Sequence, residues 1–178
     1  MGFRLSDTTE VVLENVRVPQ SAVIGEVGQG MSIALNALNL SRAFISTLAV
    51  GIMQRALDEA VAYAKQFGRR LIDFEMVQQM LADMAIKTEA ARVLVNNCMR
   101  QMDAGEMVRK DGAIVKTFVT DAMQEVVSDA VQVLGGYGYS EEYPVEKLMR
   151  DAKIFQIFEG SNQIQRMTIA KELDREYQ

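Results

Sequence analysis

The sequence predicts a mainly α-helical fold, an antiparallel four-helix bundle with a short β remnant at its start. Three long segments place apolar residues at helical spacing, and short connections separate them, as in antiparallel bundles. The only two prolines, Pro19 and Pro144, both lie where we expect elements to begin or end. We expect residues 1–26 to be the end of a middle β domain or a linker, and residues 27–178 to form the bundle.

The first expected element is one strand, or two short strands around a bulge. Residues 9–18 mix β-branched and apolar residues with polar ones and end before Pro19, which is typical of a strand. A lone strand has no sheet to join. We therefore expect either that the chain begins inside a larger β domain or that strand 11–18 packs on the helices.

Residues 33–64 form the first expected helix. Leu, Ile, Ala, Val and Met occur on nearly all of its sides, so we expect it to be buried on most faces. We predict that this helix stops at Phe67-Gly68.

The second expected helix, residues 74–102, has one packing seam with alternating spacings of four and three. The members of the seam are Val77, Leu81, Met84, Thr88, Ala91, Val95, Cys98 and Met102. The break at residues 103–105 precedes a third helix, whose apolar residues recur about every four positions. These residues are Ile114, Phe118, Ala122, Val126, Ala130 and Val133.

Gly135-Gly136 ends the third helix. A short segment begins at Pro144, a residue suited to a first helical position. The last helix is expected over residues 162–172, with Ser161 as its N-cap.

Composition narrows the function classes. A chain of 178 residues can bury a sizeable core. The formal net charge of −5, without a strong Lys/Arg cluster, argues against a nucleic-acid partner. No uninterrupted apolar run reaches the roughly 18 residues of a membrane span, so we expect none. The first ten residues show no targeting pattern, and the expected compartment is the cytoplasm.

The chain has no histidine and a single cysteine. This excludes Ser-His-Asp and Cys-His catalysis and Glu-x-x-His metal sites, so we predict no metal site. Acid–base chemistry then falls to a carboxylate, Lys or Tyr. Because Cys98 lies in the packing seam, we expect a buried and unreactive thiol.

Glu159 is the candidate for such chemistry, because residues 143–162 bring it to a Gly-Ser-Asn turn that can open a helix. Spacing alone favours a structural explanation, since an acid near a helix N-terminus gains about 0.3–1 kcal/mol from the dipole. Likewise, Gly135-Gly136 alone indicates an ordinary helix C-cap. Arg42 on a long helix is also explained as a snorkelling or ion-paired residue.

Two motifs resemble the C-terminal domain of acyl-CoA dehydrogenases: Phe158-Glu159-Gly160-Ser161 and Gln132-Val133-Leu134-Gly135-Gly136. The resemblance extends over essentially the whole chain. It implies that Glu159 is the base that removes the α-proton of an acyl-CoA thioester, while the β-hydrogen leaves as hydride to the flavin of FAD. The product would be the trans-2-enoyl-CoA, and electron-transfer flavoprotein would be the electron acceptor.

The resemblance also implies which residues contact cofactor and substrate. Gln132, Val133, Leu134, Gly135 and Gly136 would line the adenosine side of FAD across a dimer interface. Ser161, Asn162 and Gln163 would contact the flavin through amides at the positive end of a helix. Asn39, Ser41, Arg42 and Gly160 would contact the acyl-CoA. Ser41 stands where the isovaleryl and long-chain branches carry an alternative glutamate base, so the resemblance assigns the base to Glu159, as in short- and medium-chain members.

Two departures from the family pattern are expected to weaken FAD binding. The first helix ends Tyr63-Ala64-Lys65-Gln66-Phe67-Gly68, which lacks three residues of the family's Tyr-Ala-x-Glu-Arg-x-Gln-Phe-Gly, including an Arg that reaches the FAD phosphate. Glu75 occupies the place of a family Gln. A second hypothesis therefore stays open: a non-catalytic helical-bundle oligomerisation module that has lost flavin binding. Both hypotheses predict a homodimer or homotetramer.

Overall fold

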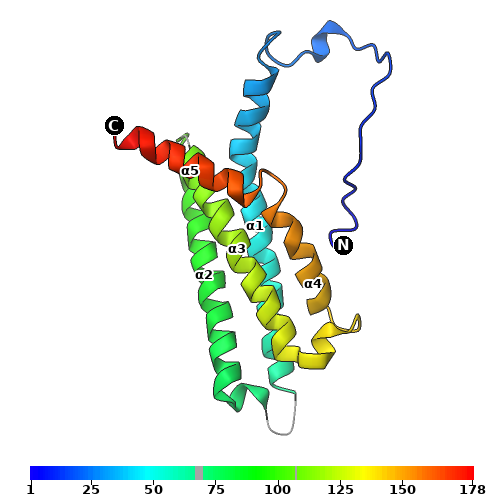
Figure 1. Cartoon of the computed structure of the whole chain (residues 1–178), viewed down its shortest axis with the longest axis vertical. Helices are drawn as coiled ribbons and strands as arrows, with labels where there is room; N and C mark the ends of the chain where they lie inside the picture. Colours follow the sequence, from blue (N-terminus) through cyan, green and yellow to red (C-terminus); the bar gives the residue numbers. More distant parts are fainter. Residues whose placement is uncertain (67–69, 107) are drawn as a thin grey trace.

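The computed structural model describes residues 1–66, 70–106 and 108–178. Within these ranges the chain forms five α-helices (Figure 1): α1 (Gly30–Ala64), α2 (Glu75–Asp103), α3 (Arg109–Leu134), α4 (Val145–Ala152) and α5 (Asn162–Glu176). Short 3₁₀ helices span Gln20–Ala22, Leu71–Asp73, Gly135–Tyr139 and Lys153–Gln156. The last helical residue of α1 is Ala64, and the predicted stop at Phe67-Gly68 lies outside the described residues.

Helices α1 to α4 run alternately up and down, and α5 crosses one end of the bundle (Figure 1). The central helix is α3, which packs against each of the other four. The predicted antiparallel helical bundle is therefore confirmed. The central position of α3 matters for function, because residues on it can reach both α1 and the segment that leads into α5.

The predicted seam of α2 is also confirmed. Its buried members are Leu81, Met84, Thr88, Ala91, Val95 and Cys98. The two end members, Val77 and Met102, are partly buried and pack against the same core. The polar member, Thr88, donates its hydroxyl to the Met84 carbonyl at 2.7 Å, which satisfies it inside the core. Burial raises the pKa of the Cys98 thiol.

The stripe predicted for α3 is correct only in its C-terminal half. Ala122, Val126, Ala130 and Val133 are buried. Phe118, in contrast, is 41% exposed, and Ile114 is only half-buried. A four-residue repeat gains about 40° per step on a helix of 3.6 residues per turn. The stripe therefore rotates off the core toward its N-terminal end, where the buried positions include Val115, Lys116 and Val119.

The strand expected at residues 9–18 is wrong, because the described part of the chain contains no strand. Val11 and Leu13 are 80% and 76% exposed. A strand needs a neighbour to pair its backbone N–H and C=O groups, and nothing in the described residues supplies one. The N-terminus of the chain lies beside α4 (Figure 1). There the Phe3 N–H donates to Asp151 Oδ1 at 2.5 Å, and the Phe3 ring packs edge-on against Phe155.

Helix α1 has two different halves. From Arg42 onward its inner face is buried and rich in alanine. The helix was predicted to be buried on most of its faces. This prediction is wrong before Arg42 and along the outer side of the helix, where several large apolar side chains are exposed: Met31, Leu35, Leu38, Leu40, Phe44 and Leu48.

By length and composition α1 could cross a membrane, since an 18-residue window has a mean hydropathy of 1.4 with 28% of the window buried. The core helix of a soluble protein passes the same test. The expected absence of a membrane span therefore stays a prediction.

Candidate active site

Glu159 lies in a turn with unusual backbone geometry, between the 3₁₀ helix at Lys153–Gln156 and α5. Its φ is +56°, and the following Gly160 has a φ of +84°. The left-handed region costs a residue with a side chain roughly 1–2 kcal/mol. Surrounding contacts therefore have to hold Glu159 in place.

Side chains from two helices hold this turn by its carbonyl oxygens. Lys116 Nζ of α3 donates to the Gly160 carbonyl at 2.9 Å. Gln165 Nε2 of α5 donates to the carbonyls of Glu159 and Gly160 at 3.0 and 2.9 Å. Ser161 accepts from the Ile164 N–H at 3.4 Å, which confirms the predicted N-cap of α5. The turn is therefore fixed on both sides of Glu159.

Gly160 is required by the turn itself. A Cβ at this position would lie 2.6 Å from Gln165 Nε2, and the positive φ would strain any other residue. The family resemblance implies that Gly160 contacts the acyl-CoA. The contact with Gln165 explains the glycine without a ligand.

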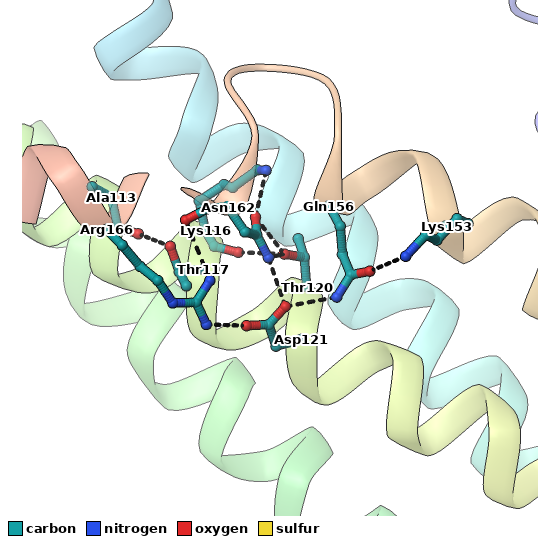
Figure 2. A network of polar contacts seen from close by, with 9 residues as sticks. All are labelled: Ala113, Lys116, Thr117, Thr120, Asp121, Lys153, Gln156, Asn162 and Arg166. Carbon is teal, nitrogen blue, oxygen red and sulfur yellow. Dashed lines mark hydrogen bonds and ion pairs between the residues drawn. The ribbon is translucent and has the colours of Figure 1, made fainter. Parts of the chain in front are cut away.

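Figure 2 shows the polar network beneath the turn, centred on the buried side chain of Asn162. Asn162 Oδ1 accepts from Lys116 Nζ at 2.7 Å, and Nδ2 donates to Thr120 Oγ1 and Asp121 Oδ1 at 2.9 and 2.7 Å. Thr120 in turn donates to the Lys116 carbonyl at 2.8 Å. Because these internal partners occupy its side chain, Asn162 could contact a flavin only through its backbone.

Asp121 connects this network to the surface. It accepts from Arg166 Nη2 at 2.6 Å and from Gln156 Nε2 at 2.7 Å (Figure 2). Burial alone would raise the pKa of this carboxyl, but the hydrogen bonds from Arg166, Gln156 and Asn162 lower it. Asp121 is therefore an ionised anchor for the residues around the start of α5.

The residues predicted to contact substrate come to Glu159 from α1. Ser41 Oγ donates to Glu159 Oε2, the most direct contact between the two parts of the candidate site. The neighbouring Arg42 donates from Nη1 to Asn39 Oδ1 at 3.0 Å and is 7% exposed. Burial and the charge of Arg109 lower the pKa of Arg42, whereas Glu159 raises it. The structure thus brings Asn39, Ser41, Arg42 and Glu159 together.

Two hollows open beside this group. An apolar hollow of about 430 Å³ is lined by Ser41, Phe44, Ile45, Thr47, Leu48, Met99 and Glu159. A more polar hollow of about 460 Å³ is lined by Asp121, Lys153, Gln156, Ile157, Ser161, Asn162, Gln163 and Arg166. A carboxylate therefore faces an apolar space, and the N-terminus of α5 faces a polar one.

The second group of predicted cofactor residues lies elsewhere. Gln132 is roughly 24 Å along α3 from Lys116, at about 1.5 Å per residue. Val133 and Leu134 are buried in the core, so their side chains cannot contact a ligand. Gln132, Gly135 and Gly136 are exposed. One copy of the chain therefore does not bring these residues to the Glu159 turn.

The sequence did not predict the residues that support the turn: Lys116, Thr120, Asp121, Gln156, Gln165 and Arg166. The available signal was Lys116 with Thr120, four residues apart in a stretch of α3 (residues 113–120) where Thr117 is the one other polar residue. It was missed because the predicted stripe placed the buried face at Ile114 and Phe118 instead.

The fold and these residues define a helical domain with a carboxylate at the edge of an apolar hollow, and comparison with known proteins identifies its family. Residues 28–173 match the model of the acyl-CoA dehydrogenase C-terminal domain. The chain is 48% identical over 179 residues to a probable acyl-CoA dehydrogenase of Mycobacterium tuberculosis, covering 98% of this chain and 46% of the relative. It is 40% identical over 173 residues to the caffeyl-CoA reductase-Etf complex subunit CarC of Acetobacterium woodii, covering 96% and 46%.

Among solved structures, butyryl-CoA dehydrogenase from Megasphaera elsdenii matches with a TM-score of 0.88 and 43% sequence identity, over 91% of this chain and 43% of that one. The chain therefore belongs to the acyl-CoA dehydrogenase family and matches its C-terminal helical domain. It spans slightly less than half the length of these relatives.

Proposed function

We propose that this chain provides the catalytic base of an FAD-dependent acyl-CoA dehydrogenase, which converts an acyl-CoA thioester to the trans-2-enoyl-CoA. The observation that carries this proposal is the contact between Ser41 and Glu159, on a turn held in a left-handed conformation at the edge of an apolar hollow. A carboxylate held beside apolar space is suited to removing a proton from a carbon acid.

The chemistry assigned to Glu159 is a proton transfer. An α-C–H is a weak acid, so the site has to stabilise the charge that develops on the thioester oxygen. Glu159 takes the α-proton on its carboxylate as the double bond forms between the α- and β-carbons. The backbone N–H of Glu159 is the donor that the family resemblance assigns to the thioester oxygen, and the apolar hollow would exclude water from the acyl chain.

FAD, when bound, supplies the acceptor for the hydride that leaves the β-carbon. The polar hollow fits one side of such a cofactor, because Ser161 and Gln163 line it at the positive end of α5 together with Lys153 and Arg166. Gln132 with Gly135 and Gly136 would serve the adenosine side. Their position at the far end of α3 supports contact with a flavin held by a second copy of the chain.

Two partners belong to this proposal. Electron-transfer flavoprotein is the proposed electron acceptor, supported by the relative whose name places it in an Etf complex. A homodimer or homotetramer is supported by the exposed apolar side chains of α1. The proposed compartment is the cytoplasm, and residues 1–26 are proposed to be the end of a middle β domain or a linker.

The alternative is a non-catalytic oligomerisation module. Glu75 favours this alternative. It is the exposed first residue of α2. An acid there interacts favourably with the helix dipole, which explains the residue without a bound flavin. A visible absorption spectrum of the purified protein that contains this chain separates the two functions, because flavin bands at a one-to-one ratio would exclude the module and their absence would exclude the catalytic function. From the 178-residue chain alone we expect weak flavin binding or none, and flavin bands at a one-to-one ratio would contradict that expectation.

The test of catalysis is Glu159→Gln in the flavin-loaded protein that contains this chain. Gln keeps the size of the side chain but cannot accept the α-proton, so acyl-CoA should still bind while flavin reduction slows by roughly 10²- to 10⁴-fold. Glu142→Gln, an exposed acid far from the turn in the sequence, is the matched control and should leave the rate unchanged. An unchanged rate in Glu159→Gln would refute the catalytic assignment.

A further inference from the structure

Lys116 is a fully buried lysine with an unusual set of partners. None of its side chain is exposed, and its ammonium donates to two neutral oxygens, those of Gly160 and Asn162. Burying a charge costs several kcal/mol unless close partners compensate for the lost water. A methionine of similar length would fill the space without that cost. The lysine therefore needs an explanation beyond packing.

Several charged groups surround the Lys116 ammonium. Burial lowers the pKa of Lys116 to about 8; Asp121 of α3 and Glu159 of the turn act to raise it, and Arg42 of α1 acts to lower it. The ammonium is therefore largely protonated at neutral pH and can donate its hydrogen bonds there. Both oxygens that it contacts belong to residues within three positions after Glu159 in the chain.

Gln165 provides a second, independent observation about the same turn. Its amide is oriented so that Nε2 contacts the carbonyls of both Glu159 and Gly160, while the buried Oε1 has no hydrogen-bond partner. Leaving such an acceptor unsatisfied costs about 1–3 kcal/mol. The reverse orientation would place Oε1 against two carbonyl oxygens. The orientation of Gln165 is therefore dictated by the turn.

We propose that Lys116 is a positioning residue for the base. It holds the Glu159–Gly160 turn in its left-handed conformation and thereby keeps the carboxylate against Ser41, with Gln165 acting on the same turn from α5. This inference rests on the proposed function of Glu159. Without the Lys116 contact, the turn can relax toward a less strained backbone and move the carboxylate. Misplacement of a reacting group by about 1 Å can cost as much as 10²-fold in rate.

The first experiment replaces Lys116 by methionine in the flavin-loaded protein. The expected result is flavin reduction by acyl-CoA slowed by about 10- to 10²-fold, with the Kd for acyl-CoA changed by less than about threefold. Thr117→Val is the matched control. Thr117 is buried beside Lys116 on α3, and its hydroxyl donates to the Ala113 carbonyl of the same helix, so its loss should change neither quantity.

The second experiment separates positioning from a general effect on the fold. In a background with Glu159→Gln and Ser41→Glu the base is moved to α1, where residue 41 already reaches the position of the Glu159 carboxylate. In the native background Lys116→Met should slow flavin reduction. In the background with the base on residue 41, Lys116→Met should change the rate by less than about threefold, because the turn no longer carries the base. Equal losses in the two backgrounds, or no loss in the native one, would overturn the proposal.

If Lys116→Met does not fold, the rate of Gln165→Met is compared in the same two backgrounds instead, since Gln165 holds the turn through the carbonyls of Glu159 and Gly160. The outcomes also distinguish this inference from the proposed function. If Glu159→Gln alone leaves the rate unchanged, both are lost. If Glu159→Gln abolishes the reaction but Lys116→Met is as fast as the native protein, only the positioning role is lost.

Discussion

The two halves of α1 belong to one helix but have opposite surroundings. After Arg42 the inner face carries mostly small residues, together with Met53 and Tyr63, and all of them are buried within this chain. Before Arg42 large apolar side chains such as Met31 and Leu35 are exposed. The chain therefore completes its own core around the second half, and the first half has an apolar surface suited to a partner. Residues 41 and 42, which reach toward the candidate base, lie at the boundary.

The largest expected effect compares two methionines of α1. Met53 is fully buried, whereas Met31 is 73% exposed. Met53→Ala should lower the free energy of unfolding by about 2–5 kcal/mol, because it leaves a cavity in the core. Met31→Ala should change it by less than about 0.5 kcal/mol. Urea denaturation of the 178-residue chain at low concentration measures both.

Repeating the measurement at high protein concentration sharpens the comparison. If the first half of α1 is covered in a homodimer or homotetramer, Met31→Ala should become less stable relative to the native chain as the concentration rises, because association stabilises the native chain more than a variant with a weakened interface. Similar losses for the two variants at low concentration would show that α1 is not divided in this way.

A smaller effect tests the burial of the Lys116 ammonium, which contacts the turn that carries Glu159. The folded-state pKa of Lys116 is about 8, below the ordinary 10.5. Between these values the unfolded chain binds more protons than the folded one, so the stability of the native protein relative to Lys116→Met should rise as the pH increases from about 8 to 10.5. The rise should be on the order of 2–3 kcal/mol. Thermal unfolding of both proteins across this range measures it, and a constant difference would contradict the burial of a charged Lys116.

The sequence was sufficient to predict those parts of the fold that depend on local periodicity. The seam of α2 was predicted because spacings of four and three follow one face of a helix, and Ser161 was predicted because N-capping depends on one side chain and its next turn. The strand at residues 9–18 failed for the opposite reason. Strand formation depends on pairing with another segment, and β-branched composition carries no information about that partner.

The candidate site likewise contains residues that could be predicted from the sequence and residues that could not. The family resemblance led to Glu159, Ser41 and Arg42, and the structure brings them together. It did not lead to Lys116 or Gln165, which act on backbone oxygens of the turn. A contact from a side chain to a distant carbonyl leaves almost no trace in residue type. The left-handed φ of Glu159, which makes such support necessary, was equally invisible in the sequence.

The close approach of Gly160 to Gln165 also has an evolutionary consequence. Any side chain at residue 160 would meet the Gln165 amide and a backbone unsuited to it. A substitution of Gly160 therefore requires the end of the Gln165 side chain to move and also strains the backbone. A smaller residue at position 165, in contrast, leaves Gly160 unaffected. Descendants of this chain are therefore expected to vary more readily at residue 165 than at residue 160.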